Sequence, residues 1–311
     1  MKSGYVDNIR LSNRELETLY EIVKVSHSAP WLRYSINGLH SSQTAKLCGV
    51  YANDSLASFA WHMQRTWIVE NRSFTGLSIG LVTTIPSKRN LGYAKQLIAG
   101  IEDMAYRQNM DFLYLAGIPG FYGKFGFIGI APKSKLVIRR DDLPKVRGSI
   151  RDLTRWDLDV VCKMYNSYSS LIASYSARSA QEWDDLIGPL STTFLFNQPR
   201  IILNDKDSPV AYFCSTPGNS GLIREFVPLP DQVSVITALA IIASHAEYCD
   251  QGKIEVFTPS TGPVWDAAAQ TIGGDFLCFL RPKSSNMIKW ISKFRTMADY
   301  RCSFILQGDM L

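Results

Sequence analysis

Apolar positions along this chain follow two periods, one typical of strands and one typical of helices. From Gly76 to Pro86 the apolar residues crowd into a short run that ends at a proline, which predicts a strand. From Gly92 to Gln108 they recur every three or four residues, which predicts an amphipathic helix. A short apolar run from Asp111 to Ala116 predicts the next strand. The predicted apolar helix face is Leu97, Ile98, Ile101, Met104 and Ala105.

The same order of elements recurs roughly 140 residues later. Gly221 to Pro230 resembles the first strand and also ends in a proline, and Gln232 to Cys249 has the pattern of a helix. A short apolar strand is predicted from Lys253 to Phe257. Because these matches keep nearly the same offset, they favour two copies of one α/β module.

The start of each copy carries the same helix-initiation signal. Ser12 is followed three residues later by Glu15, and Thr154 is followed by Asp157 at the same spacing. This spacing predicts a capping box, in which each side chain accepts a hydrogen bond from the other residue's backbone. The loop-prone segment from Asp141 to Gly148 is the expected junction. We therefore expect an α/β (α+β, mixed-sheet) protein with domains at residues 1–145 and 146–311.

Composition narrows the class of protein. The 311 residues are 46% hydrophobic and 20% charged, as expected for a globular chain. The net charge of +5 comes without any basic block longer than pairs such as Arg139-Arg140, so we expect no nucleic-acid partner. The longest apolar stretch, Val233 to Ala246, is too short and too polar for a membrane span. Met1 to Asp7 has no apolar segment of a secretory signal, so we expect a cytoplasmic protein.

The cysteines and histidines give no metal-binding pattern in sequence. None of the six cysteines forms a CxxC pair, and none of the four histidines stands at ligand spacing. We therefore expect no metal site and interpret the thiols as small apolar side chains.

The segment around Lys88 to Ala94 has the pattern of a ligand-binding site. After the first predicted strand, a short basic turn with Lys88 and Arg89 precedes a helix that starts over Gly92. The first amides of a helix have no intrahelical partner and carry partial positive charge, so this turn predicts a site for a diphosphate. Gly92 and the small Ala94 allow a phosphate to approach the backbone. No GxGxxG motif follows a strand, and Gly117 to Phe125 lacks the glycine spacing of a P-loop.

The same segment resembles a known signature. Arg89 to Ala94 matches the Q/R-x-x-G-x-G/A motif of the GCN5-related N-acetyltransferases (GNAT), which hold the pyrophosphate of acyl-CoA with it. Phe121 to Phe127 resembles the closing Tyr-x-x-x-Gly-Phe element of that family. The resemblance implies acetyl-CoA, or another acyl-CoA, as co-substrate. The implied cofactor-binding residues are Val82, Thr83, Thr84, Lys88, Arg89, Asn90, Leu91, Gly92, Tyr93 and Ala94.

The repeated arrangement resembles the enhanced-intracellular-survival type of acetyltransferase. In that group one GNAT-like domain holds the cofactor and a second, degenerate one shapes the acceptor pocket. Here the second copy has Pro230 to Ser234 where the pyrophosphate loop would be, with no glycine and with an acid in place of a base. The resemblance thus implies one cofactor site per chain. A third, sterol-carrier-like domain has no expected counterpart before Leu311, so its catalytic carboxylate is not carried over.

The resemblance implies catalytic roles for several residues but does not identify the general base. Tyr122 is the implied general acid, and Trp31 and Tyr34 stand where relatives build the acceptor pocket. Residues 76–85 contain no acid, so the general base stays open among a water chain, an amine that binds neutral, and three side chains. Those three are Glu70, His62 and Asp111. In the second copy, Glu225 beside Arg224 is interpreted as a surface or interface ion pair.

The resulting expectation is an acyl-CoA-dependent N-acyltransferase. It would transfer acetyl from acetyl-CoA to a primary amine by direct attack, without a covalent enzyme intermediate. Two alternatives remain: a non-catalytic acyl-CoA-binding or interaction module, and an aminoacyl-tRNA-dependent peptidyl transferase. The acceptor is expected to be a small molecule with an amine, without nucleic-acid or membrane partners, and a homo-oligomer stays open.

Overall fold

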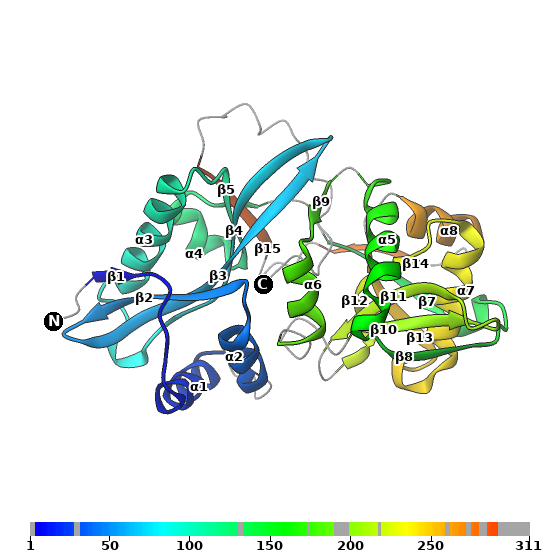
Figure 1. Ribbon diagram of the computed structural model, residues 1–311, viewed down its shortest axis with the longest axis horizontal. Coiled ribbons are helices and arrows are strands. Elements are labelled where there is room, and N and C mark those ends of the chain that lie inside the picture. The colour runs from blue at the N-terminus through cyan, green and yellow to red at the C-terminus, as the bar shows by residue number, and fades with distance from the viewer. Residues whose placement is uncertain are drawn as a thin grey trace.

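Two β-sheets flanked by helices make up the protein. The computed structural model describes residues 4–27, 32–129, 133–172, 174–189, 199–216, 219–258, 262–271, 275–279 and 285–291. Figure 1 shows the two sheets side by side, each built mainly from one half of the chain. The α/β class and the mixed sheets predicted from the sequence are therefore present.

The first sheet is antiparallel except at one pair of strands. Its order is β1-β2-β3-β4-β5-β15-β6, and β9 pairs with the end of β3. The one parallel pair, β4 with β5, is the β–α–β unit predicted from the sequence. The strands are β1 (Gly4–Val6), β2 (Ala45–Ala52), β3 (Ser55–Val69), β4 (Arg72–Thr84), β5 (Phe112–Gly117), β6 (Ile128–Gly129), β9 (Ser174–Ala177) and β15 (Ser285–Trp290).

The second sheet has the same arrangement. Its order is β8-β10-β11-β12-β13-β7-β14, and its parallel pair is β12 with β13. The strands are β7 (Lys133–Arg139), β8 (Gly148–Asp152), β10 (Arg200–Asn204), β11 (Pro209–Thr216), β12 (Asn219–Pro228), β13 (Lys253–Thr258) and β14 (Asp275–Phe279). Matching orders of antiparallel and parallel neighbours are what a repeated module requires.

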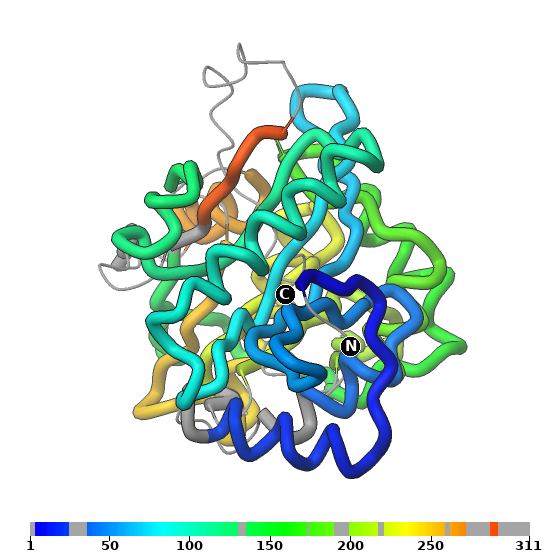
Figure 2. The backbone as a smooth tube through the Cα atoms, turned by 90° about the vertical axis from the view of Figure 1, so that its left-hand side faces the viewer, coloured from blue at the N-terminus to red at the C-terminus, as the bar shows by residue number. Residues whose placement is uncertain are grey.

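The two halves exchange one strand each. The sixth strand of the first sheet is β15, near the end of the chain, and the sixth strand of the second sheet is β7, from the first half. In Figure 2 the red β15 accordingly lies beside first-half elements. The boundary at residue 145 stays a prediction, because neither sheet is completed by one half alone.

Helices cover the sheets and carry the predicted caps. In Figure 1, α3 lies on one side of the first sheet and α1 and α2 lie on the other. Both capping boxes are confirmed: the Ser12 amide donates to Glu15 over 2.7 Å, and the Thr154 amide donates to Asp157 over 2.9 Å. The α-helices are α1 (Asn13–His27), α2 (Leu32–Ser41), α3 (Tyr93–Arg107), α4 (Pro119–Tyr122), α5 (Leu158–Ser169), α6 (Ala180–Ile187), α7 (Gln232–Ser244) and α8 (Pro263–Thr271). Short 3-10 turns are η1 (Pro86–Lys88), η2 (Gly123–Phe125), η3 (Arg140–Asp142), η4 (Arg155–Asp157) and η5 (Ala246–Tyr248).

The two halves are packed against each other. Asp185 of α6 is buried and accepts hydrogen bonds from the Ser42 hydroxyl (2.6 Å) and the Thr44 amide (2.9 Å) at the start of β2. Arg65 of β3 pairs with Glu182 of α6. One apolar cluster runs from the α1–α2 face of the first sheet into the second sheet, whereas α3 covers a separate cluster. No helix among the described residues is long and apolar enough to cross a bilayer.

Candidate functional site

A cavity of about 490 Å³ opens where β4 ends and α3 begins. Its walls come from the last residues of β4, the loop after η1, the first turn of α3 and the segment α4–η2. The described residues that line it are Val82, Thr83, Thr84, Lys88, Arg89, Asn90, Gly92, Tyr93, Ala94, Lys95, Phe121 and Phe125.

The cavity exists because β4 and β5 separate. Their parallel pairing ends at Ile79 and Leu115, although β4 continues to Thr84. On the other side, β4 shifts register against β3, and Leu81 takes a left-handed φ of 51°. Such a bulge bends the strand and turns its edge. The end of β4 therefore presents backbone groups to the cavity rather than to β5.

The first turn of α3 faces the same cavity. Gly92 is its N-cap residue, with φ of 84°, and no side chain caps the helix there. A Cβ atom at Gly92 would meet nothing within 4 Å, so the glycine is required by the left-handed backbone rather than by crowding. Within the described part of the chain, the leading amides of the helix therefore have no side-chain cap, as the sequence predicts.

Cations surround these amides. Lys88, Arg89 and Lys95 all line the cavity. The Arg89 Nε atom donates to the carbonyl of Thr84 over 3.4 Å, which ties the basic loop to the end of β4. Helix dipole and formal charge therefore act together, and the site favours an anion.

Nine of the ten residues expected to hold the cofactor line this one cavity. Leu91 is the exception: its side chain is 62% exposed. Sequence reasoning missed Lys95, Phe121 and Phe125 as lining residues. Lys95 directly follows the Arg89 to Ala94 motif, and both phenylalanines lie within the Phe121 to Phe127 element, so proximity to these motifs was the available signal.

Tyr122 lies next to the cavity rather than in its lining. It ends α4, and its ring packs where a Cβ atom on Gly117 would be, with 2.3 Å to the nearest ring atom. The ring also meets Phe121 at a centroid distance of 4.9 Å. Burial raises the pKa of the Tyr122 phenol to about 12, so the hydroxyl keeps its proton at neutral pH.

Trp31 and Tyr34 are the residues expected to line the acceptor pocket. Trp31 lies outside the described residues, and Tyr34 is described only as part of the backbone of α2. Their expected role as pocket walls stays a prediction.

The three candidate bases do not reach the cavity. Glu70 is exposed in the turn between β3 and β4, and Asp111 accepts a hydrogen bond from the Thr75 amide (2.8 Å). The Nε2 atom of His62 lies 2.7 Å from a carboxylate oxygen of Asp7. None of the three is among the described lining residues.

The second copy fills the corresponding positions with its own side chains. Asp231 caps α7 by accepting from the Ser234 amide (2.9 Å). The surface or interface ion pair expected between Glu225 and Arg224 is wrong, because the partner of Glu225 is Arg178. Glu225 is fully buried and accepts from Arg178 over 2.9 Å and 2.6 Å, because β12 turns it inward, whereas Arg224 donates to Thr216.

Comparison with known proteins agrees with this geometry. Residues 32–129 match the family model described as an acetyltransferase (GNAT) domain. No curated protein matches the chain.

Solved structures match nearly the whole chain at low identity. A probable N-acyltransferase from Enterococcus faecalis is 14% identical with a TM-score of 0.65, covering 92% of this chain and 73% of that one. Eis1 from Mycobacterium abscessus is 12% identical with a TM-score of 0.60, covering 94% and 75%. The N-myristoyltransferase of Saccharomyces cerevisiae, solved with myristoyl-CoA, is 10% identical with a TM-score of 0.58, covering 91% and 82%. These likenesses show the fold.

Proposed function

We propose that this chain, which carries a GNAT domain, is an acyl-CoA-dependent N-acyltransferase that moves acetyl from acetyl-CoA to a primary amine. The observation that carries the proposal is the uncapped start of α3 beside the free edge of β4, in a basic cavity. A volume of about 490 Å³ is within the usual range for small-molecule sites.

The cavity suits the parts of CoA in order. Its diphosphate would accept from the amides that follow Gly92, with Lys88 and Arg89 as counter-charges. Its pantetheine arm would run along Val82 to Thr84, whose backbone groups face the gap left by β5. Phe121 and Phe125 supply apolar wall on the far side.

Acyl transfer needs a neutral amine, a stabilised oxyanion and a protonated leaving thiolate. The amine nitrogen would bond to the thioester carbon, and the carbon–sulfur bond would then break. A backbone amide at the bulge of β4 would donate to the oxyanion, and Tyr122 would give its proton to the departing sulfur. The phenol suits this role because its pKa of about 12 keeps it protonated. The described lining holds no carboxylate or imidazole, so the amine would bind neutral or lose its proton to water.

The finer identity of the reaction is part of the same proposal. Trp31 and Tyr34 would form walls of the acceptor pocket, and the acceptor would be a small amine. The chain would act in the cytoplasm, without a metal in the chemistry of this cavity.

Tyr122→Phe tests the chemistry. Release of free thiol from acetyl-CoA is measured with a panel of amines: aminoglycosides, amino sugars, polyamines, amino acids and lysine peptides. Loss of a general acid costs about a hundredfold or more in turnover, while CoA affinity by calorimetry should not change. Tyr106→Phe is the matched control, because Tyr106 lies exposed on α3, outside the cavity lining.

The other outcomes separate the alternatives. CoA binding without turnover on any amine would favour a non-catalytic acyl-CoA-binding module. No CoA affinity, together with tRNA binding that weakens with salt, would favour a peptidyl transferase. Either result contradicts the proposal.

A further inference from the structure

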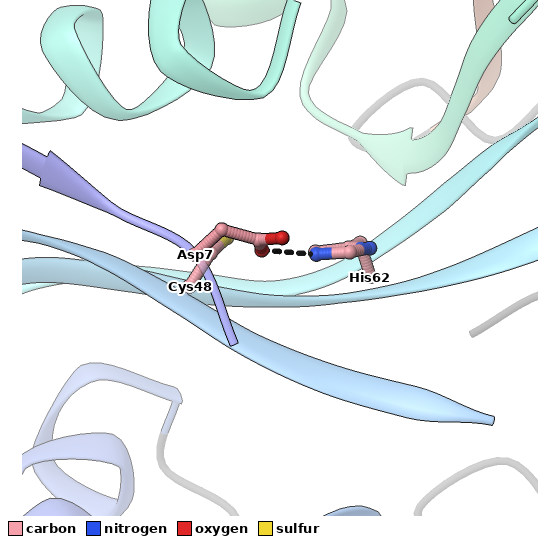
Figure 3. A group of neighbouring side chains, drawn as sticks. All are labelled: Asp7, Cys48 and His62. Carbon is pink, nitrogen blue, oxygen red and sulfur yellow. Dashed lines mark hydrogen bonds and ion pairs between the residues drawn. The ribbon is translucent and has the colours of Figure 1, made fainter. Parts of the chain in front are cut away.

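Three strands of the first sheet bring together side chains that the proposed reaction does not use. Val6 pairs with Gly49, so the next residue along, Asp7, lies beside Cys48 of β2. Cys48 pairs with Ala60 of β3, and His62 follows two residues later on the same face. The sulfur of Cys48, a carboxylate oxygen of Asp7 and a ring nitrogen of His62 lie within 4.8 Å of one another (Figure 3).

The surroundings make this a built cluster rather than a chance surface grouping. Cys48 is fully buried and His62 is 5% exposed, under the face of the sheet that α3 covers. The imidazole of His62 points toward the carboxylate of Asp7, as Figure 3 shows. Asp7 is 30% exposed, which leaves an entry path for an ion from the edge of the sheet.

The donor set has a chemical preference. Thiolate sulfur, imidazole nitrogen and carboxylate oxygen are all donors that Zn²⁺ accepts, whereas Mg²⁺ and Ca²⁺ prefer oxygen alone. A thiolate and a carboxylate together balance the charge of a divalent ion. Zinc bonds of about 2.0–2.3 Å would place the three donors at the corners of a small tetrahedral face. In the structure the three donor atoms lie within 4.8 Å of one another, and the 2.7 Å hydrogen bond between His62 and Asp7 would give way to bonds from both groups to the ion.

We propose that Asp7, Cys48 and His62 bind one Zn²⁺ ion, with water at the fourth position. The ion would tie the edge strand β1, which has only three residues, to β2 and β3. Tyr5 lies on the same face and donates to the sulfur of Met104 (3.8 Å), which closes the far side of the cluster beneath α3. The site is separate from the cavity at the start of α3, so it does not depend on the proposed acyl transfer.

The cluster was invisible in the sequence, where the three residues are separated by 41 and 14 positions. Metal-ligand patterns in sequence are local, and the pairing of β1, β2 and β3 creates this one. The expectation of no metal concerned spacing along the chain alone. The sheet supplies the spacing that the sequence lacks.

The test is metal binding to untagged full-length protein treated with a chelator. Zinc is titrated by calorimetry, and cobalt is added in its place because thiolate ligation gives a charge-transfer absorption. We expect one ion per chain, a thiolate–cobalt band and a higher melting temperature with zinc. In Cys48→Ser the band should vanish, and in Asp7→Asn zinc affinity should fall at least about tenfold, the least that even outer-shell changes cost.

Cys214→Ser is the matched control, because Cys214 is equally buried in β11 and lies outside the cluster. It should keep both the band and the affinity. Asp7→Asn covers the case in which Cys48→Ser fails to fold, since Asp7 is partly exposed and the amide can still accept from His62. Absence of stoichiometric zinc binding by the wild type, or equal binding by the wild type and Asp7→Asn, would overturn the inference. CoA titrations of the same variants keep this result separate from the proposed function.

Discussion

The two halves of this chain build the same β–α–β unit and finish it differently. In the first, α3 begins at Gly92 with no side-chain cap, beside a cavity. In the second, Asp231 caps α7. The parallel pairing ends at Ile79 of β4 in the first half and at Ile223 of β12 in the second. Two residues further along these strands are Leu81 and Glu225, respectively. The shared fold creates the same helix start in both halves, and a few side chains decide whether that start is left uncapped or is capped.

The difference has an electrostatic reason. An open helix start attracts an anion, whereas a capping carboxylate satisfies the leading amides and repels a second negative group. Arg178 further fills the second half, since its guanidinium packs on the rings of Tyr165 (4.5 Å) and Trp183 (4.9 Å). The second half therefore fills with its own side chains the region that the first half leaves open as a cavity.

The largest expected effect concerns the buried ion pair of the second half. Arg178→Met leaves Glu225 without its charged partner in the core, which should cost about 3–5 kcal/mol of unfolding free energy. Chemical unfolding measures it. The double variant Arg178→Met with Glu225→Leu should recover most of the loss, and equal stability of the single variant and the wild type would contradict the role of this pair.

The next effect tests the open helix start. Gly92→Asp places a carboxylate beside the leading amides of α3, as in the second half, and CoA affinity should fall by at least about a hundredfold. Gly92→Ala is the control, because it carries at least as much strain at a positive φ but no charge. If both variants lose the same affinity in calorimetry, strain rather than charge explains the loss.

A smaller effect distinguishes the two capping boxes. Glu15→Ala should cost about 1 kcal/mol, whereas Asp157→Ala should cost about 2 kcal/mol, because Arg151 also donates to Asp157 over 2.7 Å and 2.6 Å. Unfolding by denaturant compares the two. Equal costs would show that Arg151 adds nothing.

The same carboxylate gives a pH dependence. Hydrogen bonds from Arg151 lower the pKa of Asp157 from 3.8 to about 2. Because the pKa of Asp157 is lower in the folded state than in the unfolded state, ionised Asp157 contributes fully to stability above pH 3.8. That contribution is lost as the pH falls from 3.8 through the folded-state pKa of about 2. The stability difference between the wild type and Asp157→Asn should therefore shrink from neutral pH to about pH 2, and a constant difference would contradict this.

The smallest effect belongs to the cap of α7. Asp231→Ala should cost about 1 kcal/mol, and Asp231→Asn much less, because an asparagine side chain can still accept from the Ser234 amide. CoA affinity should not change in either variant. A gain of a second CoA site per chain in Asp231→Ala would show that this cap alone closes the second half.

Local features were predictable from the sequence and long-range ones were not. The strand before Pro86, the helix after Gly92 and both capping boxes depend on neighbouring residues, so their patterns are readable. The exchange of β7 and β15 depends on which distant edges meet, and neither short strand carries a pattern that names its partner. The bulge at Leu81 is a further case, because a bulky residue gives no signal for a positive φ.

In the candidate site, too, the parts formed by neighbouring residues were predictable and the parts formed by distant residues were not. The segment from Val82 to Ala94 is continuous in sequence, and nine of the ten residues named there line the cavity, whereas the walls added by Phe121 and Phe125 come from another segment. Glu225 was misjudged because its neighbour Arg224 suggested a pair, while its real partner, Arg178, is 47 positions away. The three side chains considered as a base, Glu70, His62 and Asp111, lie outside the described cavity lining, and the strand segment 76–85 contains no acid.

The most direct measurement follows backbone amide resonances of isotope-labelled wild-type protein as CoA is added. The account predicts that the amides of Tyr93, Ala94 and Lys95 shift strongly and saturate at one CoA per chain, while those at the start of α7 do not move. Unshifted amides at the start of α3 in the presence of bound CoA, or shifts at α7 instead, would contradict it.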